Sequence, residues 1–205
     1  MRAHPIFAAL YEPVTMLAER RMLRRLRGQL FGELPGRVLD LGAGVGYSFR
    51  SLQKADRVVA LEPDPSMLRR ARARAESRPV ELVLGDGMRL PFRDGSFDAV
   101  AAALVLCTVP DLATVLAEVR RVLVPGGRLA FLEHVRLPGW KGRLQDLATP
   151  AWRRLVVGCH LNRGTGEAIR EAGFAIERLD SHWGGLLLVG LATSVPLHPG
   201  PAGPQ

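Results

Sequence analysis

The amino-acid sequence predicts an α/β domain built around a mostly parallel β-sheet. Two observations carry this prediction. Short apolar runs rich in β-branched residues alternate with helical patterns from about residue 37 onward. A glycine-rich turn follows the first of these runs, at the place where parallel α/β sheets bind their ligands. The 205 residues are enough for one well-buried domain and few for two.

Seven apolar runs are expected to form the strands of this sheet. They occupy residues 37–42, 57–62, 80–86, 97–106, 127–135, 174–181 and 186–195. The first five look like strands buried on both faces, because they are apolar without a regular polar alternation. We therefore expect helices to flank the sheet.

Helical patterns lie between these runs. One helix is expected to begin near Ser48, directly after the glycine-rich turn. A second follows Asp64, because Pro65 suits the first turn of a helix. A third spans Asp111 to Leu123, where apolar residues recur at helical spacing.

The chain is expected to divide into three parts. Residues 1–36 form an N-terminal helical arm or lid, residues 37–195 the α/β domain, and residues 196–205 a disordered tail. Within the domain, residues 136–165 interrupt the alternation with a mixed polar and apolar helical insertion, which we place on the substrate side. A short helix closed by Gly173 precedes the last two strands.

Composition excludes several classes of protein. Hydrophobic residues at 47% and charged residues at 23% rule out a disordered or collagen-like chain. The net charge of +8 points only weakly to a polyanionic partner, because nearly all basic residues are arginines and coding bias explains such a share. Cys107 and Cys159 make neither a disulfide framework nor a CxxC pair, which favours a reducing compartment.

The sequence contains no recognisable targeting signal. Pro5, Glu12 and Pro13 break the first apolar run, which is too poor for a secretory signal. The apolar part of the uncharged stretch 183–205 is shorter than the roughly 20 residues that a spanning helix needs. We therefore expect a cytoplasmic protein.

The glycine-rich turn reads VLDLGAGVGYS. Its glycines, Gly42, Gly44 and Gly46, allow a ligand to approach the backbone closely. A dinucleotide fingerprint would need glycine or alanine where Tyr47 stands, so the spacing argues against NAD. Asp40 adds a carboxylate just before the turn, which suits a ligand with an ammonium group better than a pyrophosphate.

Two further acids stand at strand ends. Glu62 ends the second strand, 20 residues after Gly42, and can accept hydrogen bonds from ribose hydroxyls. Asp86 ends the third strand and can accept from an adenine amino group, while the nearby Met88 packs on the ring. Strand ends meet at one edge of a parallel sheet, so we expect one crevice lined by acids. The alternative is a set of unrelated strand-terminal caps.

Together these segments resemble the class I S-adenosylmethionine-dependent methyltransferases. The resemblance covers roughly residues 37–135 and rests on VLDLGAGVGYS, ALEPDPSML, GDGMRLPF with FDAV, and RRVLVPGGRLAFLEHV. It implies a Rossmann-like sheet of seven strands with the last strand antiparallel. It also implies S-adenosylmethionine as methyl donor and S-adenosylhomocysteine as product.

The resemblance further implies which residues hold this cofactor. The methionine end would contact Asp40, Gly42, Ala43 and Gly44. The ribose would contact Glu62, and the adenine would contact Asp86, Gly87 and Met88. The sulfonium would lie near Ala103 and Leu104.

A narrower resemblance extends to about residue 195. The segments ALVLCTVPD, FLEHV, TPAWRRLVVGC and LNRGT are similar to the methyltransferase-like thiol S-methyltransferases and related bacterial proteins. The animal enzymes carry an N-terminal membrane-anchoring segment, whereas this chain begins with an arginine-rich arm. The resemblance implies a small, rather apolar acceptor, in the first place a thiol. Alternatives are a methyltransferase of a lipid, quinone or polyketide-like natural product, and a catalytically idle cofactor-binding protein.

A thiol acceptor places modest demands on the enzyme. A sulfonium is an activated methyl donor, so orienting the acceptor and excluding water are the main tasks. A thiol is already ionised to a few per cent at neutral pH and needs no strong base. Candidate pocket residues are Tyr11, Cys107, Thr108, Trp140, Trp152, Cys159 and His160.

His134 and several of these pocket candidates also have an alternative interpretation. His134 is the candidate general base, or a strand-end residue with one backbone hydrogen bond. Cys107 and Trp152 are core residues in the alternative interpretation. No metal is expected, because Cys159 and His160 are adjacent rather than at a metal-ligand spacing.

The expected partner is a small molecule and not a nucleic acid. LVLCTVPD stands where amino-methylating DNA enzymes place an Asn/Asp-Pro-Pro-Tyr/Phe segment, and the aromatic content of 6% offers no stacking cluster. The segment ERRMLRRLRGQL predicts a helix with Met22, Leu23, Leu26 and Leu30 on one side. That side makes weak contact with a membrane surface in one interpretation and packs on the domain in the other. The sequence leaves the oligomeric state open.

Overall fold

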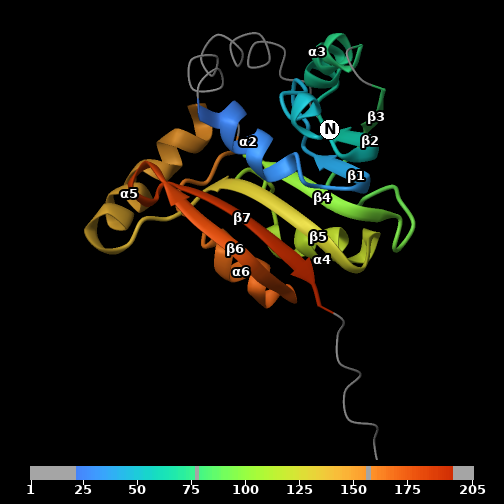
Figure 1. The fold of residues 1–205 in the computed structure, drawn as a ribbon. Helices are drawn as coiled ribbons and strands as arrows, with labels where there is room; N and C mark the ends of the chain where they lie inside the picture. The colour runs from blue at the N-terminus through green and yellow to red at the C-terminus, as the bar shows by residue number, and fades with distance from the viewer. Residues whose placement is uncertain (1–21, 77–78, 156–157, 196–205) are drawn as a thin grey trace, which may run out of the picture.

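The computed structural model describes residues 22–76, 79–155 and 158–195. Within them, one sheet contains the strands β1 Gly36–Leu41, β2 Ala55–Glu62, β3 Val80–Leu84, β4 Phe97–Ala103, β5 Leu123–His134, β6 Phe174–His182 and β7 Leu187–Ser194 (Figure 1). Their order is β3-β2-β1-β4-β5-β7-β6. β7 is antiparallel to both neighbours, and the other adjacent pairs are parallel. The predicted seven-stranded sheet with an antiparallel last strand is confirmed.

Helices cover both faces of this sheet. α2 (Arg24–Phe31) and α3 (Pro65–Ala75) lie on one face, and α4 (Leu112–Val122) and α6 (Thr165–Glu171) lie on the other (Figure 1). Side chains alternate between the faces along each strand. Val38 therefore packs in the cluster that includes the leucines of α2, whereas its neighbour Leu39 packs in the cluster of α4. The two cores hold the strand ends in fixed positions relative to one another.

The helices α3 and α4 begin where the sequence predicts. Asp64 caps α3, and its Oδ1 accepts a hydrogen bond from the Ser66 N–H at 2.7 Å. Asp111 caps α4, and its Oδ1 accepts from the Ala113 N–H at 3.0 Å. Such caps satisfy backbone donors that have no partner inside the helix. Both caps lie just beyond the carboxyl ends of strands, so they also shape the ligand edge of the sheet.

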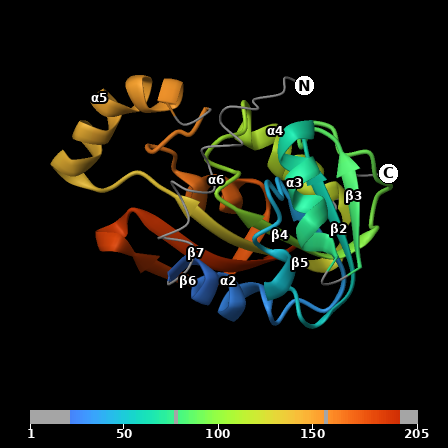
Figure 2. The same cartoon turned by 90° about the horizontal axis from the view of Figure 1, so that it is seen from above.

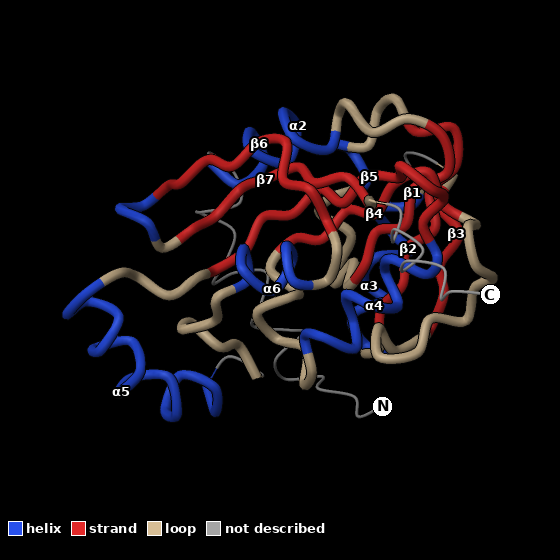
Figure 3. Tube along the Cα trace, turned by 90° about the horizontal axis from the view of Figure 1, so that it is seen from below, coloured by secondary structure: helices blue, strands red, loops and turns tan. Residues whose placement is uncertain are grey.

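The helical insertion is present as α5, Gly139–Leu155, which follows β5. Figures 2 and 3 show it projecting from the domain, away from the sheet. The Thr149 hydroxyl donates a hydrogen bond to the Gln145 carbonyl, one helical turn earlier, at 2.6 Å. Pro150 lies inside the helix.

The expected helix near Ser48 is wrong. Only one 3₁₀ turn, η2 at Phe49–Ser51, follows the glycine-rich turn. β2 begins at Ala55, which leaves too few residues for a cooperative α-helix. The ring of Phe49 is fully buried and anchors this short connection instead.

Two strand predictions also need correction. β3 was expected to be buried on both faces, but it lies at the edge of the sheet and Leu84 is 47% exposed. β4 was expected to reach residue 106, but it ends at Ala103. Leu104 adopts a left-handed conformation with φ +57°, which an extended strand cannot continue. The segment after Ala103 therefore leaves the sheet and becomes a loop.

The arginine-rich helix α2 packs on the domain. Leu23, Leu26 and Leu30 are buried in the cluster that contains residues of β1, β2, β4, β5 and β7. The apolar side that a membrane surface would need is thus used inside the protein. Arg24 and Arg25 are exposed, so electrostatic contact with anionic head groups stays a prediction. No helix in the described ranges is both long and apolar enough to cross a membrane.

Candidate active site

Glu62 ties the glycine-rich turn to the end of β2. Its Oε2 accepts from the Gly44 N–H at 2.8 Å, and its Oε1 accepts from the Asp64 N–H at 2.9 Å. Burial raises the pKa of this carboxyl, and the two backbone hydrogen bonds act in the opposite direction. Each carboxylate oxygen keeps a second lone pair. Glu62 therefore fixes the turn and retains acceptor capacity for a ligand.

Asp40 is a buried acid with one unused oxygen. It is 1% exposed, and in the described part of the chain its Oδ2 has no hydrogen-bond partner. Burial raises its pKa to about 7, although the charge of Arg27 and a hydrogen bond from Ser48 lower it. Leaving such an acceptor unpaired is costly. A ligand with an ammonium group would satisfy it.

The glycines of the turn have different neighbours. A side chain at Gly42 would collide with Val105, since an added Cβ would lie 2.3 Å from its Cγ2. An added Cβ at Gly44 would have no atom within 4 Å, so space is open there. Both glycines have positive φ, which other residues rarely adopt. Ala43, between them, is buried. The turn thus packs against the loop that follows β4 at Gly42 and leaves open space at Gly44.

The residues to which the resemblance gives the adenine follow β3, which ends at Leu84 and not at Asp86 as expected. Asp86 is exposed, and its Oδ1 accepts from the Met88 N–H at 2.9 Å. Met88 is half-buried and packs against the core on the α4 side of the sheet. Gly87 is buried, and an added Cβ would lie 3.4 Å from a methyl group of Leu41. Asp86 thus presents an exposed carboxylate, two residues before a methionine that packs against the core.

Glu133 is a site residue that sequence reasoning missed. It is fully buried at the end of β5 and accepts from the N–H groups of Val105, Leu106 and Cys107 at 3.0, 2.9 and 3.1 Å. Burial raises its pKa, against the effect of these three donors. The available signal was an acid inside the otherwise apolar segment FLEHV. Glu133 holds the loop that follows β4 and starts at Leu104.

The insertion is tied to the same loop. The Arg163 guanidinium donates to the carbonyls of Leu106, at 2.6 Å, and Val109. The His160 N–H donates to the Cys107 carbonyl at 2.8 Å. These contacts place residues 159–163 against the carboxyl end of β4. Arg163 is a second residue that received no role from the sequence.

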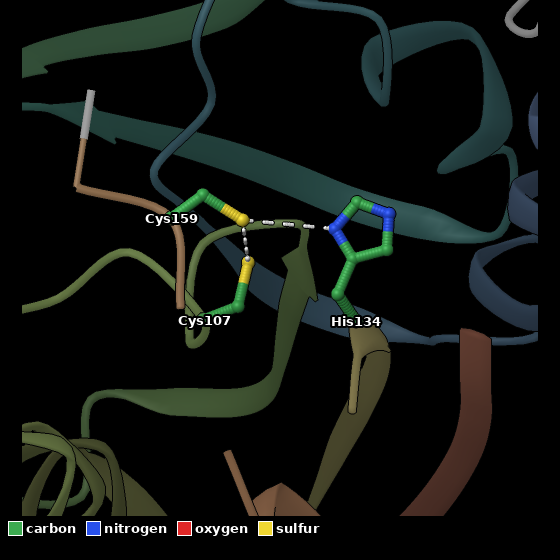
Figure 4. Close-up of side chains that lie close together, drawn as sticks. All are labelled: Cys107, His134 and Cys159. Atoms are coloured by element: carbon green, nitrogen blue, oxygen red, sulfur yellow. Dashed lines mark hydrogen bonds between the residues drawn. The ribbon is translucent and has the colours of Figure 1, made fainter. Parts of the chain in front are cut away.

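Two thiols and one imidazole meet at the ends of β4 and β5 (Figure 4). The Sγ atoms of Cys107 and Cys159 are 3.7 Å apart, and Cys159 Sγ is 3.8 Å from His134 Nδ1. Both cysteines are buried, and His134 is half-buried. The hydrogen bond between the two thiols and burial raise the pKa of Cys107, whereas the hydrogen bonds with Cys107 and His134 lower the pKa of Cys159. His134 thus faces a thiol rather than a backbone group.

The remaining candidates divide between this cluster and the surface. Trp152 is 37% exposed, so it is not a core residue, and it contributes to the lowered pKa of Cys159. Thr108 is half-buried and donates its hydroxyl to the Val105 carbonyl. His160 is half-buried, and desolvation lowers its pKa. Trp140 is 68% exposed, outside the buried cluster. Tyr11 lies outside the described residues.

Comparisons with known proteins identify the family of this chain. A family described as "Methyltransferase domain" matches residues 39–131. Thiol S-methyltransferase TMT1B of Homo sapiens is 35% identical over 82% of this chain and 75% of its own length. The chain therefore belongs to the class I S-adenosylmethionine-dependent methyltransferases.

Two further similarities mark the range of relatives. A demethylmenaquinone methyltransferase of Thermus thermophilus is 37% identical over 63% of this chain and 61% of its own length. A chain in the solved complex of the Haloferax volcanii Trm112 methyltransferase activator and a methyltransferase has a TM-score of 0.78 and 20% identity. That alignment covers 95% of this chain and 99% of the other. At that identity, the solved structure shows the fold alone.

The residues present fit S-adenosylmethionine, the cofactor of this family. The unpartnered Oδ2 of Asp40 lies in β1, just before the turn whose Gly44 is open, and would hold the ammonium group. Glu62 would hold the ribose. Asp86 would accept from the adenine, with Met88 as the apolar floor. Ala103 and Leu104 are half-buried at the end of β4, beside this turn through Val105.

Asp86→Ala is expected to weaken cofactor binding by about 1–3 kcal/mol, because it removes the charged acceptor proposed for the adenine amino group. Calorimetric titration with S-adenosylhomocysteine measures the change. Asp94→Ala is the matched control, since Asp94 is an exposed acid that contacts Arg121 and not the cofactor residues. Equal affinities of Asp86→Ala and the unmodified protein would remove Asp86 from the cofactor site.

Proposed function

We propose that this methyltransferase moves the methyl group of S-adenosylmethionine to a small, apolar thiol. The observation that supports this acceptor is the chemistry at the ends of β4 and β5. Glu133 is the carboxylate there, and three backbone N–H groups already occupy it. Thiols and an imidazole remain, which suits an acceptor that needs no strong base. The similarity to thiol S-methyltransferase TMT1B supports the same choice.

Within this proposal, S-adenosylmethionine supplies an electrophilic methyl group when it is bound. The chain's own residues then have separate tasks. Asp40 and Glu62 hold the donor at the ends of β1 and β2. Glu133 holds the loop after β4 against the site, which fixes the direction from which an acceptor approaches. Orientation of this kind contributes roughly 7–11 kcal/mol in well-placed reactions. His134 is the candidate group for the acceptor proton.

His134→Ala is expected to leave cofactor affinity unchanged and to lower the rate of methyl transfer. Its imidazole faces Cys159 and not the acids that hold the cofactor. Single-turnover kinetics and calorimetry on the same preparation separate the two effects. If His134→Ala lost cofactor affinity instead, the assignment of His134 to the acceptor side would be wrong.

The acceptor is tested with a panel of compounds. Small alkyl thiols, reduced quinones and lipid vesicles are each incubated with S-adenosylmethionine, and both products are measured by mass spectrometry. We expect thioether and S-adenosylhomocysteine in equal amounts from alkyl thiols without added lipid. Turnover restricted to quinones or vesicle-borne compounds would favour the lipid, quinone or natural-product alternative. Cofactor binding without turnover of any acceptor would favour a catalytically idle protein.

The quinone alternative has one specific observation in its favour. The demethylmenaquinone methyltransferase of Thermus thermophilus shares 37% identity with this chain. Its match covers less of this chain than that of thiol S-methyltransferase TMT1B, 63% against 82%. The thiol proposal therefore stays first. The free cysteines support a reducing compartment, so we propose the cytoplasm as the location.

A further inference from the structure

The cluster of Cys107, His134 and Cys159 has donor atoms of the kinds that zinc prefers. Their ligand atoms all lie within 4.8 Å of one another. Borderline-soft Zn²⁺ is bound by thiolate sulfur and imidazole nitrogen. The three residues come from the loop after β4, the end of β5 and the insertion. A local sequence spacing could not reveal such a set, because 52 positions separate the cysteines.

Two of the three distances between ligand atoms are close to those of a tetrahedral site. Zn–S bonds of about 2.3 Å and Zn–N bonds of about 2.0 Å place two sulfurs about 3.8 Å apart, and a sulfur and a nitrogen about 3.5 Å apart. The structure has 3.7 Å between the two sulfurs and 3.8 Å between Cys159 Sγ and His134 Nδ1. The third pair, Cys107 Sγ and the His134 nitrogen, lies within 4.8 Å and would have to close by up to about 1.3 Å.

The backbone around the cluster is fixed by other residues. Glu133 accepts from the Cys107 N–H, and the His160 N–H donates to the Cys107 carbonyl. Arg163 ties the insertion to the loop after β4. Preorganised ligands lose little freedom when a metal binds. Hydrogen bonds that orient the ligands are typical of metal sites.

We propose that Cys107, Cys159 and His134 bind Zn²⁺ as a three-ligand site at the carboxyl ends of β4 and β5, where the acceptor is proposed to bind. Two thiolates neutralise the charge of the ion. Three protein ligands leave a fourth tetrahedral position for a molecule from outside the chain, as in catalytic zinc sites. With the ion bound, His134 is a ligand through Nδ1, so its role as the group for the acceptor proton applies only to the metal-free protein.

The fourth position would also bind the acceptor thiol. This part of the inference rests on the proposed function. A thiol at the fourth position would lose its proton to solvent and bind as thiolate, because a metal lowers the pKa of its ligand. Its sulfur then forms a bond to the methyl carbon while the carbon–sulfonium bond breaks. Thiol and S-adenosylmethionine give thioether, S-adenosylhomocysteine and one proton. No oxidant or reductant is needed.

Cobalt(II) titration of the reduced, chelator-treated protein tests the site. The chain has only two cysteines, so a sulfur-to-cobalt absorption band reports this cluster alone. We expect saturation at one equivalent and displacement of the band by Zn²⁺. Cys107→Ser, Cys159→Ser and His134→Gln should each weaken binding at least tenfold, and the control His182→Gln should not. Absence of the band, or a band insensitive to these variants, would overturn the proposal.

A second measurement does not depend on the folding of variants. In the unmodified protein, one equivalent of Zn²⁺ should protect both cysteines from alkylation, as read by mass spectrometry. The reaction is run until the buried thiols of the metal-free protein are alkylated, and equal alkylation with and without Zn²⁺ then contradicts the site. So does a Cys107–Cys159 disulfide that survives the reducing treatment.

The acceptor step is tested separately. We expect an alkyl thiol to shift the cobalt band of the loaded protein, and chelation to raise the KM for that thiol. Metal binding without thiol methylation would refute the proposed function and leave the metal site standing. Thiol methylation without metal binding would refute the metal site and leave the proposed function standing. If alkyl thiols do not shift the absorption band of the cobalt-loaded protein, only the proposed role of the fourth position is contradicted.

Discussion

Asp40→Asn is expected to weaken the binding of S-adenosylhomocysteine by about 2–5 kcal/mol, the usual loss when one member of a buried charged pair is removed. The reason is the buried Oδ2 of Asp40, which has no partner among the described residues. Calorimetry at alkaline pH, where the carboxyl is ionised, measures the effect. Asp56→Asn is the control, because Asp56 is an exposed acid of β2. A loss of the same size in both variants would contradict the role of Asp40.

The same residue predicts a pH dependence of cofactor binding. Burial raises the pKa of Asp40 to about 7. Protonation removes the charge that attracts the ammonium group, so affinity should fall as the pH drops below about 7. If only the ionised form binds, the fall approaches about tenfold per pH unit. Asp40→Asn should flatten this profile. An unchanged profile in the variant would assign the titration to another group.

Glu133→Ala is expected to lower the free energy of unfolding by roughly 3 kcal/mol. It leaves three N–H groups without acceptors, of which those of Leu106 and Cys107 are buried and each cost about 1–3 kcal/mol, and losing a buried charge offsets part of this. Urea denaturation measures the change. Thiol methylation should fall as well, because the loop that carries Cys107 loses its anchor.

Two matched variants sharpen this prediction. Glu133→Gln keeps one oxygen for Val105 and Leu106 but turns an amide N–H₂ toward the Cys107 N–H, so its loss should be smaller. Glu81→Ala, at an exposed position of β3, should change stability by less than about 0.5 kcal/mol. If Glu133→Ala were as stable as Glu81→Ala, Glu133 would not anchor the loop.

The sheet could be predicted from the sequence because its signals are local. Apolar runs and the capping acids Asp64 and Asp111 locate strands and helices without knowledge of the fold. The helix expected at Ser48 does not form, because β2 already begins at Ala55 and the connection is too short for an α-helix. The end of β4 was missed for another reason. Glu133, 28 residues beyond Val105, draws the following amides out of the sheet.

The two halves of the site differed in predictability. Asp40, Glu62 and Asp86 each stand at the end of an apolar run, so strand position alone brings them to one edge. The acceptor side is assembled by contacts between distant segments. Cys107 meets Cys159 only because the insertion folds back on the β4 loop, and no local pattern encodes that return.

A crystal structure with bound S-adenosylhomocysteine would test the cofactor site most directly. We expect the ammonium group against Asp40, the ribose hydroxyls on Glu62 and the adenine beside Asp86. We also expect the sulfur to point toward the loop held by Glu133. A ligand bound away from the ends of β1, β2 and β3, or a sulfur directed away from that loop, would contradict it.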